Sequence, residues 1–151
     1  FISSAESPKD VSDVDDLSEL EGLDGIICGI PTWNTGADEE RSGTAWDSIL
    51  EDIGELSLSG KKVAIFGLGD SSTYTENYCD AMEELHSYFQ KAGADMVGYV
   101  DKGSYTFEES KSIIGESFCG LPLDEDSESD LTDSRLETWA SQLKGEIPAL
   151  G

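Results

Sequence analysis

Two aromatic residues stand among small polar residues, in segments whose side chains could bind a flat ligand. Trp33 lies in Pro-Thr-Trp-Asn-Thr-Gly-Ala at residues 31–37, and Tyr74 lies in Gly-Asp-Ser-Ser-Thr-Tyr-Thr-Glu-Asn-Tyr at residues 69–78. Aromatic side chains stack on flat rings in offset geometry, and the neighbouring hydroxyl and amide groups could bond to the polar edge of a ring. The alternative is that both aromatics only pack against their own loops.

Each of these segments follows a run of apolar residues. Residues 25–30 and 63–68 are continuously apolar, which is typical of strands buried on both faces of a parallel sheet. Residues 96–100 and 118–121 are two further candidate strands. Ligands of open α/β sheets bind at the carboxyl ends of the strands, so the loops after residues 30 and 68 are where we expect a site.

Helical patterns alternate with these runs. Apolar residues recur at helical spacing in 46–53 and 136–143, and a third pattern covers about 77–91, with Gly93 as its expected stop. Strands alternating with helices predict an α/β fold with a doubly wound parallel sheet. The length of 151 residues predicts a single domain spanning 1–151.

The composition excludes several classes of partner. Nine basic and 33 acidic residues give a net charge of −24, which repels nucleic acid and anionic lipid but leaves basic proteins as possible partners. No apolar run is long enough for membrane insertion, and the first residues do not resemble a signal peptide. Because the first residue is Phe1, we expect a processed product or a fragment. Three dispersed cysteines predict neither a disulfide framework nor a zinc site.

Other candidate sites are weak. His86, the only histidine, has no nucleophile beside it in the sequence and is expected at the surface. The acidic residues 124–130 are expected to form a solvated loop, because they lack the glycine and the distal glutamate of a calcium loop. Residues 67–69 read Gly-Leu-Gly, but no third glycine of a dinucleotide fingerprint follows.

The two aromatic loops resemble those of flavodoxins, and most closely those of the long-chain algal type. The resemblance runs from about residue 11 to 145 and rests on Pro-Thr-Trp-Asn-Thr-Gly at 31–36 and on Gly-Leu-Gly-Asp through Tyr74 to Asn77. It extends through residues 36–43 and 105–112. In long-chain members a loop interrupts the fifth strand, and residues 101–117 match that loop.

The resemblance implies a flavodoxin-like sheet of strand order 2-1-3-4-5 and non-covalent FMN as cofactor. The strand that would come first, its phosphate-binding loop and most of the following helix have no counterpart in the sequence, so strand 1 is expected to be missing. An exposed apolar strand edge, and weak or no FMN binding, would follow. The implied cofactor-binding residues are Thr32, Trp33, Asn34, Thr35, Gly36, Gly67, Leu68, Gly69, Asp70, Tyr74, Asn77 and Cys79.

The implied function is that of a low-potential electron carrier that is not an enzyme. Acidic residues near the two loops disfavour adding electrons to a bound ring; they are Asp38, Glu39, Glu40, Asp70, Glu76 and Asp80. By resemblance, the partners are ferredoxin-NADP reductase and photosystem I, the complete protein is a monomer, and its compartment is the chloroplast stroma if algal and otherwise the cytoplasm. The alternatives are a cofactor-free acidic interaction module and the FMN domain of a larger reductase.

Overall fold

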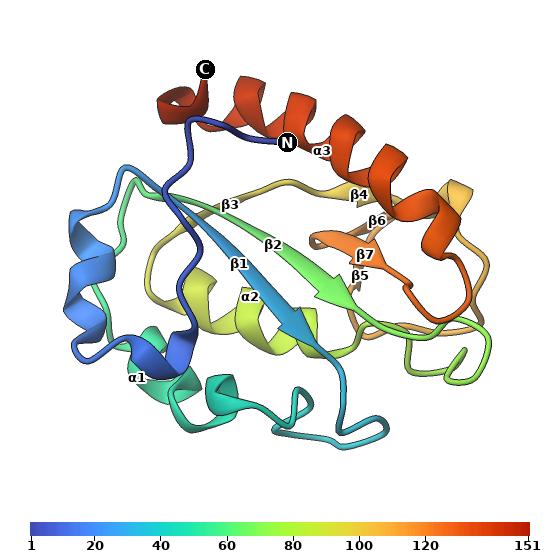
Figure 1. The fold of residues 1–151 in the computed structure, drawn as a ribbon. Coiled ribbons are helices and arrows are strands. Elements are labelled where there is room, and N and C mark those ends of the chain that lie inside the picture. Colours follow the sequence, from blue (N-terminus) through green and yellow to red (C-terminus); the bar gives the residue numbers. More distant parts are fainter.

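The computed structural model describes residues 1–151, and its centre is a parallel sheet (Figure 1). Strand β2 (Lys62–Leu68) pairs along its whole length with β1 (Gly25–Pro31). On its other side β2 pairs first with β3 (Asp95–Val97) and then with β7 (Leu121–Leu123). The two apolar runs therefore form the strands predicted for them, and the expected α/β class with a parallel sheet is confirmed.

The third strand position is divided by an insertion. β3 and β7 lie end to end against β2, and the residues between them form a three-stranded antiparallel sheet of order β4-β6-β5. Its strands are β4 (Val100–Asp101), β5 (Ile113–Ile114) and β6 (Ser117–Phe118). The interruption was predicted, but residues 118–121 do not form one strand.

Phe118 explains that error. It belongs to β6, and its side chain is buried against the rings of Tyr78, Tyr105 and Phe107, with centroid distances of 5.1–5.9 Å. The main sheet resumes only at Leu121, after Gly120 passes so close to Ile65 that a Cβ would lie 2.2 Å from its carbonyl oxygen. An apolar run has the same pattern whether its residues bury in the sheet or in an adjoining aromatic cluster.

The helices have bounds that differ in part from the expected ones. The predicted helix at 46–53 divides into a 3-10 segment, η3 (Ala45–Ser48), and a short helix, α1 (Leu50–Gly54). Helix α2 (Ala81–Lys91) begins four residues later than expected, because Cys79 has a positive φ of 53° that helical backbone cannot contain. Gly93 follows α2 with φ 92°, as predicted, and α3 (Thr132–Glu146) contains the expected C-terminal pattern.

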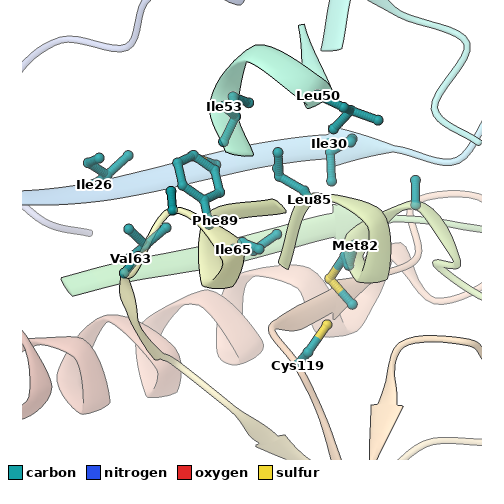
Figure 2. Packing of buried hydrophobic residues seen from close by; sticks show 14 of the residues in the cluster. Ile26, Ile30, Leu50, Ile53, Val63, Ile65, Met82, Leu85, Phe89 and Cys119 are labelled. Atoms are coloured by element: carbon teal, nitrogen blue, oxygen red, sulfur yellow. The ribbon is translucent and has the colours of Figure 1, made fainter. Parts of the chain in front are cut away.

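The helices cover the two faces of the sheet (Figure 1). Figure 2 shows Leu85 and Phe89 of α2 packing over the strands, with Ile53 of α1 beside them. The strand residues facing them include Ile26 of β1 and Val63 of β2. A smaller cluster on the opposite face joins α3 to the strands; it contains Ala64, Leu121, Leu123, Trp139, Leu143 and Ile147. No helix combines the length and apolar character needed to cross a membrane.

β1 is an edge strand. It pairs only with β2, so its other side has no ladder partner in the described sheet. The preceding residues form only 3-10 segments, η1 (Val11–Asp13) and η2 (Leu17–Gly22). The dark blue N-terminal segment in Figure 1 runs from the end of α3 toward α1, and the Ser4 hydroxyl donates to the carbonyl of Leu150 at 3.2 Å.

Three more 3-10 segments complete the chain. The segments are η4 (Lys102–Ser104), η5 (Ser129–Leu131) and η6 (Pro148–Leu150).

His86 is buried, contrary to expectation: it is 4% exposed, and its Nε2 lies 2.6 Å from the hydroxyl of Tyr99. The surface prediction was wrong because Tyr99, supplied by the chain just after β3, covers the ring. Desolvation lowers the pKa of His86.

Candidate cofactor site

Residues 32–44, here called the Trp33 loop, leave the carboxyl end of β1 (Figure 1). The N–H groups of Trp33 and Asn34 donate to the carbonyls of Ser42 and Arg41 at 3.2 and 3.0 Å, so the loop doubles back on itself. Gly36, with φ 86°, lies in the reversal, where L side chains rarely fit. This local pairing gives the loop a fixed shape without regular secondary structure.

The indole of Trp33 stands in solvent. It is 75% exposed, the largest exposed fraction among the large hydrophobic side chains of the chain, and the Tyr74 ring is 50% exposed. Both residues follow neighbouring parallel strands and so leave the same edge of the sheet (Figure 1). Two exposed rings on adjacent loops leave apolar surface in contact with water, and a flat ligand between them would cover that surface.

A buried carboxylate on α2 fixes the far side of the Trp33 loop. Glu84 is 8% exposed, and its two oxygens accept the N–H groups of Glu40 and Arg41 at 2.9 and 2.7 Å. Glu40 has a φ of 54°, which a non-glycine residue adopts only where its surroundings impose it. The Arg41 guanidinium folds inward as well, onto Glu83 at 2.6 Å.

Residues 69–80, here called the Tyr74 loop, begin with a self-bonded turn. The Asp70 carboxylate accepts the N–H groups of Ser72 and Thr73 at 3.1 and 3.0 Å, and its carbonyl accepts the N–H of Tyr74 at 3.0 Å. The hydrogen bonds from Thr73, followed by those from Ser127 and Ser72, stabilise the ionised carboxylate and lower the pKa of Asp70 to about 2. The ring of Tyr74 is therefore carried on a turn whose backbone donors are satisfied.

The insertion supports the later part of the Tyr74 loop. The N–H groups of Glu108 and Glu109 donate to the carbonyl of Thr75 at 2.9 and 3.0 Å, and the Ser110 hydroxyl donates to the carbonyl of Tyr78 at 2.5 Å. The residues that divide the third strand position thus also bond to the loop that carries Tyr74.

Asp124 contradicts the expectation of a solvated acidic loop at 124–130. Its side chain is 0% exposed and accepts both the N–H and the hydroxyl of Ser71, at 2.9 and 2.5 Å. It also accepts the N–H groups of Asp126 and Ser127. A run of acidic letters does not distinguish a surface charge from one that bonds to backbone donors, so sequence reasoning missed this residue.

The predicted site residues occupy two layers. Trp33 and Tyr74 are at the surface, and the half-buried Thr35 donates its hydroxyl to the carbonyl of Thr32 at 3.1 Å. Beneath them, the Thr32 hydroxyl accepts the N–H of Ala81 at the start of α2, at 3.1 Å. Of the other predicted site residues, Asn34, Gly36 and Leu68 are exposed, Gly69, Asp70 and Asn77 are half-buried, and Gly67 and Cys79 are buried.

Cys79 and Gly69 lie against each other within that framework. Cys79 is 0% exposed, and a Cβ added to Gly69 would lie 2.9 Å from its nitrogen and its sulfur. A ligand at the surface therefore does not reach Cys79 in this structure. Burial raises the pKa of the Cys79 thiol.

The surface around the two loops is negatively charged, as expected, but Asp80 does not contribute to it. Asp38, Glu39 and Glu76 are exposed, whereas Asp80 is only 1% exposed, with one carboxylate oxygen accepting the N–H of Lys111 at 2.8 Å. Asp80 was expected to add to the surface charge, but it lies inside the turn before α2. The nearby cations are paired: Arg41 contacts Glu83, and the Lys111 ammonium lies 4.0 Å from Asp38.

The arrangement fits a flat ring better than a phosphate. Two cavities, of about 220 and 600 Å³, lie beside the insertion, and neither is lined by Trp33 or Tyr74. The first N–H groups of α2 already donate to Thr32, Cys79 and Ser112. With those donors and the two cations engaged, these loops contain no phosphate cradle.

Comparisons with known proteins agree with this arrangement. A model of the family described as flavodoxin matches residues 3–139. The flavodoxin of Synechococcus elongatus is 42% identical over 122 residues, covering 81% of this chain and 69% of that protein. Flavodoxin 2 of Escherichia coli K12 is 38% identical over 124 residues, covering 81% and 69%.

Solved structures extend the agreement to the fold. The crystal structure of Fusobacterium nucleatum flavodoxin bound to flavin mononucleotide has a TM-score of 0.79 and 30% identity, covering 87% of this chain and 76% of that one. Oxidised Flavodoxin 1 from Bacillus cereus has a TM-score of 0.55 at 26% identity, with 88% of this chain and 73% of that one covered. With the sheet order and the two aromatic loops, these matches show that the chain belongs to the flavodoxin family.

Proposed function

We propose that this chain is an electron carrier that binds FMN between the Trp33 and Tyr74 loops and passes single electrons at low potential. Membership of the flavodoxin family makes it an electron-transfer flavoprotein and not a substrate-converting enzyme. The observation that supports the site is the pair of exposed rings, Trp33 and Tyr74, on adjacent loops at one edge of the sheet.

Each part of the site has a role in this proposal. FMN, when bound, supplies the one-electron chemistry, and the chain supplies binding, orientation and electrostatics. Trp33 and Tyr74 would cover the faces of the ring. Polar groups of the Trp33 loop, with Asn34 and Thr35 foremost, would bond to the ring edge. The acidic residues around the loops oppose added negative charge, so they lower the potential at which electrons are accepted.

The proposed partners are basic proteins, and ferredoxin-NADP reductase and photosystem I are the candidates. The exposed carboxylates of Asp38, Glu39 and Glu76 give the loops a negative surface, and the net charge of −24 extends that field. Opposite charge speeds encounter at low ionic strength. The flavodoxin relatives come from cyanobacteria such as Synechococcus and Nostoc and also from Salmonella and Escherichia coli, so they do not select one setting. The compartment proposed here is the chloroplast stroma or the cytoplasm, and the proposed working form is a monomer.

A comparison of two flavins tests the site. Because the loops hold the ring but no phosphate cradle, residues 1–151 should bind riboflavin and FMN with similar dissociation constants, both above about 1 µM. The phosphate would otherwise add charge-assisted bonds of about 1.5–3 kcal/mol each. Fluorescence titration of both flavins measures this. FMN binding at sub-micromolar concentration would show that another part of the chain binds the phosphate, and no binding of either flavin would favour a cofactor-free interaction module.

Reductive titration of the flavin-loaded chain tests electron transfer separately. Two separate one-electron steps are expected, and the second should lie at a lower potential than in free flavin, because the negative surroundings disfavour the anionic, fully reduced ring. A single two-electron step at the potential of free flavin would contradict the proposal.

A further inference from the structure

Asp124 is a buried charge with no cationic partner. It directly follows β7, its side chain is fully buried, and it forms no salt bridge. Isolated buried carboxylates are costly unless hydrogen bonds satisfy them. The four donors that reach Asp124 are the N–H and hydroxyl of Ser71 on one oxygen, and the N–H groups of Asp126 and Ser127 on the other.

These bonds connect two segments that lie far apart in the sequence. Asp124 and Ser71 are 53 positions apart, and Ser127 returns from the same turn to donate its hydroxyl to Asp70 at 2.9 Å. Asp70 in turn accepts the N–H groups of Ser72, Thr73 and Tyr74. We call these residues, 70–74 with 124–127, the Asp124 network.

We propose that Asp124 is a positioning residue that holds the Tyr74 loop in the shape that receives the flavin ring, an inference that rests on the proposed function. Asp124 does not touch the ligand in this account. It acts through Ser71 and through Ser127 on Asp70, so the turn that carries Tyr74 is fixed to the end of β7 before any ligand arrives. Preorganisation of this kind removes the cost of ordering the loop on binding.

The chemistry of the carboxylate makes the proposal testable with a substitution of almost equal size. A carboxylate only accepts hydrogen bonds, whereas an amide presents one oxygen and one NH₂ group. In Asp124→Asn, the NH₂ must face one of the two pairs of groups. Facing Ser71 it loses the bond from the N–H, while the hydroxyl can turn and accept; facing Asp126 and Ser127 it loses both bonds. Ser71→Ala removes one bond and keeps the N–H. Asp126→Asn is the matched control, because it changes the same charge at an exposed side chain of the same turn whose bond uses only its backbone.

Hydrogen–deuterium exchange and flavin titration are the two measurements. We expect amide exchange in residues 70–74 to be at least about tenfold faster in Asp124→Asn, with a smaller increase in Ser71→Ala and none in Asp126→Asn. Exchange in β1 and α2 should stay as in the parent. The riboflavin dissociation constant should rise in the same order as the exchange rates, because a more mobile Tyr74 loop must be ordered when the ring binds.

Each result decides the proposal. Equal exchange and equal affinity in Asp124→Asn and Asp126→Asn would overturn it, and so would an exchange increase spread evenly over the sheet, which a purely structural role would give. If Asp124→Asn does not fold, Ser71→Ala carries the test: loop exchange and affinity equal to the parent's would overturn the proposal. If no form binds flavin, the proposed function fails, while the exchange data still show whether Asp124 holds the loop.

Discussion

The carboxylate of Glu84 accepts the backbone N–H of Arg41, 43 positions earlier in the chain, at 2.7 Å, and that of Glu40 at 2.9 Å. One buried side chain of α2 thereby fixes the Trp33 loop, as Asp124 fixes the Tyr74 loop. Each aromatic loop of the site is therefore held by a buried carboxylate that accepts hydrogen bonds from backbone N–H groups. In this account neither carboxylate touches the flavin.

Glu84→Gln should destabilise the protein. The amide keeps one acceptor oxygen, so one of the two N–H groups loses its partner, and a buried unsatisfied donor costs about 1–3 kcal/mol. The free energy of unfolding, measured with urea, should fall by that amount. Glu51→Gln, an exposed position on α1, is the control and should change it by less than about 0.5 kcal/mol. Equal effects of the two substitutions would show that the Glu84 bonds do not contribute.

His86 should make stability depend on pH. Its pKa in the folded protein lies below the ordinary 6.5, because burial disfavours the charged ring. The unfolded chain therefore takes up the proton first, and the stability that the neutral ring contributes above pH 6.5 is lost as the pH falls through and below that value. The 33 acidic residues impose a separate dependence, so a reference variant is needed.

His86→Gln supplies that reference, because it shares the acidic background and has no titrating ring. The difference in unfolding free energy between parent and variant should become less favourable to the parent as the pH is lowered from 7.5 to 5. A difference that stays constant over this range would mean that His86 is not buried as described.

Several parts of this account follow from the sequence. The continuous apolar runs located β1 and β2, and their parallel pairing placed Trp33 and Tyr74 at the same edge, because parallel strands end on one side of a sheet. The family resemblance supplied the identity of the ligand, which residue pattern alone restricted only to a flat ring.

Other parts could not be obtained in this way. Asp124 and His86 were expected in solvent and are buried, and Glu84, which no sequence pattern singled out, is buried as well. Each has a partner 13 to 53 positions away along the chain, which is a backbone N–H, a serine hydroxyl or a tyrosine hydroxyl, and the sequence does not show that such a group will be near. A polar residue can be buried wherever the fold brings a hydrogen-bond partner to it, and the tertiary structure decides where that happens.

Thr35→Gly should widen the gap between the two one-electron reduction potentials of flavin bound at saturation. By family resemblance, we expect the Asn34-Thr35 peptide to turn when bound flavin takes up one electron, which would bring the carbonyl of Asn34 to a flavin N–H. A β-branched residue resists that rotation and glycine permits it. The threonine hydroxyl also bonds to the carbonyl of Thr32, which opposes movement further.

Thr35→Ser separates the two contributions, because it removes the branch and keeps the hydroxyl. The expected order of the gap between the potentials is glycine above serine above threonine, measured by spectroelectrochemical titration. An unchanged or narrowed gap in Thr35→Gly would exclude this peptide as the element that moves.

The central claim is that flavin binds between Trp33 and Tyr74, and flavin fluorescence titration of the single alanine variants tests it most directly. Removal of either ring should weaken riboflavin binding by about 0.5–1.5 kcal/mol beyond the loss of buried area, which raises the dissociation constant by at least about two- to twelvefold. Phe1→Ala, which removes another exposed aromatic far from the loops, is the control and should bind as the parent does. If Trp33→Ala and Tyr74→Ala both bind riboflavin as tightly as the parent, the two rings only pack against their own loops, and the site described here is wrong.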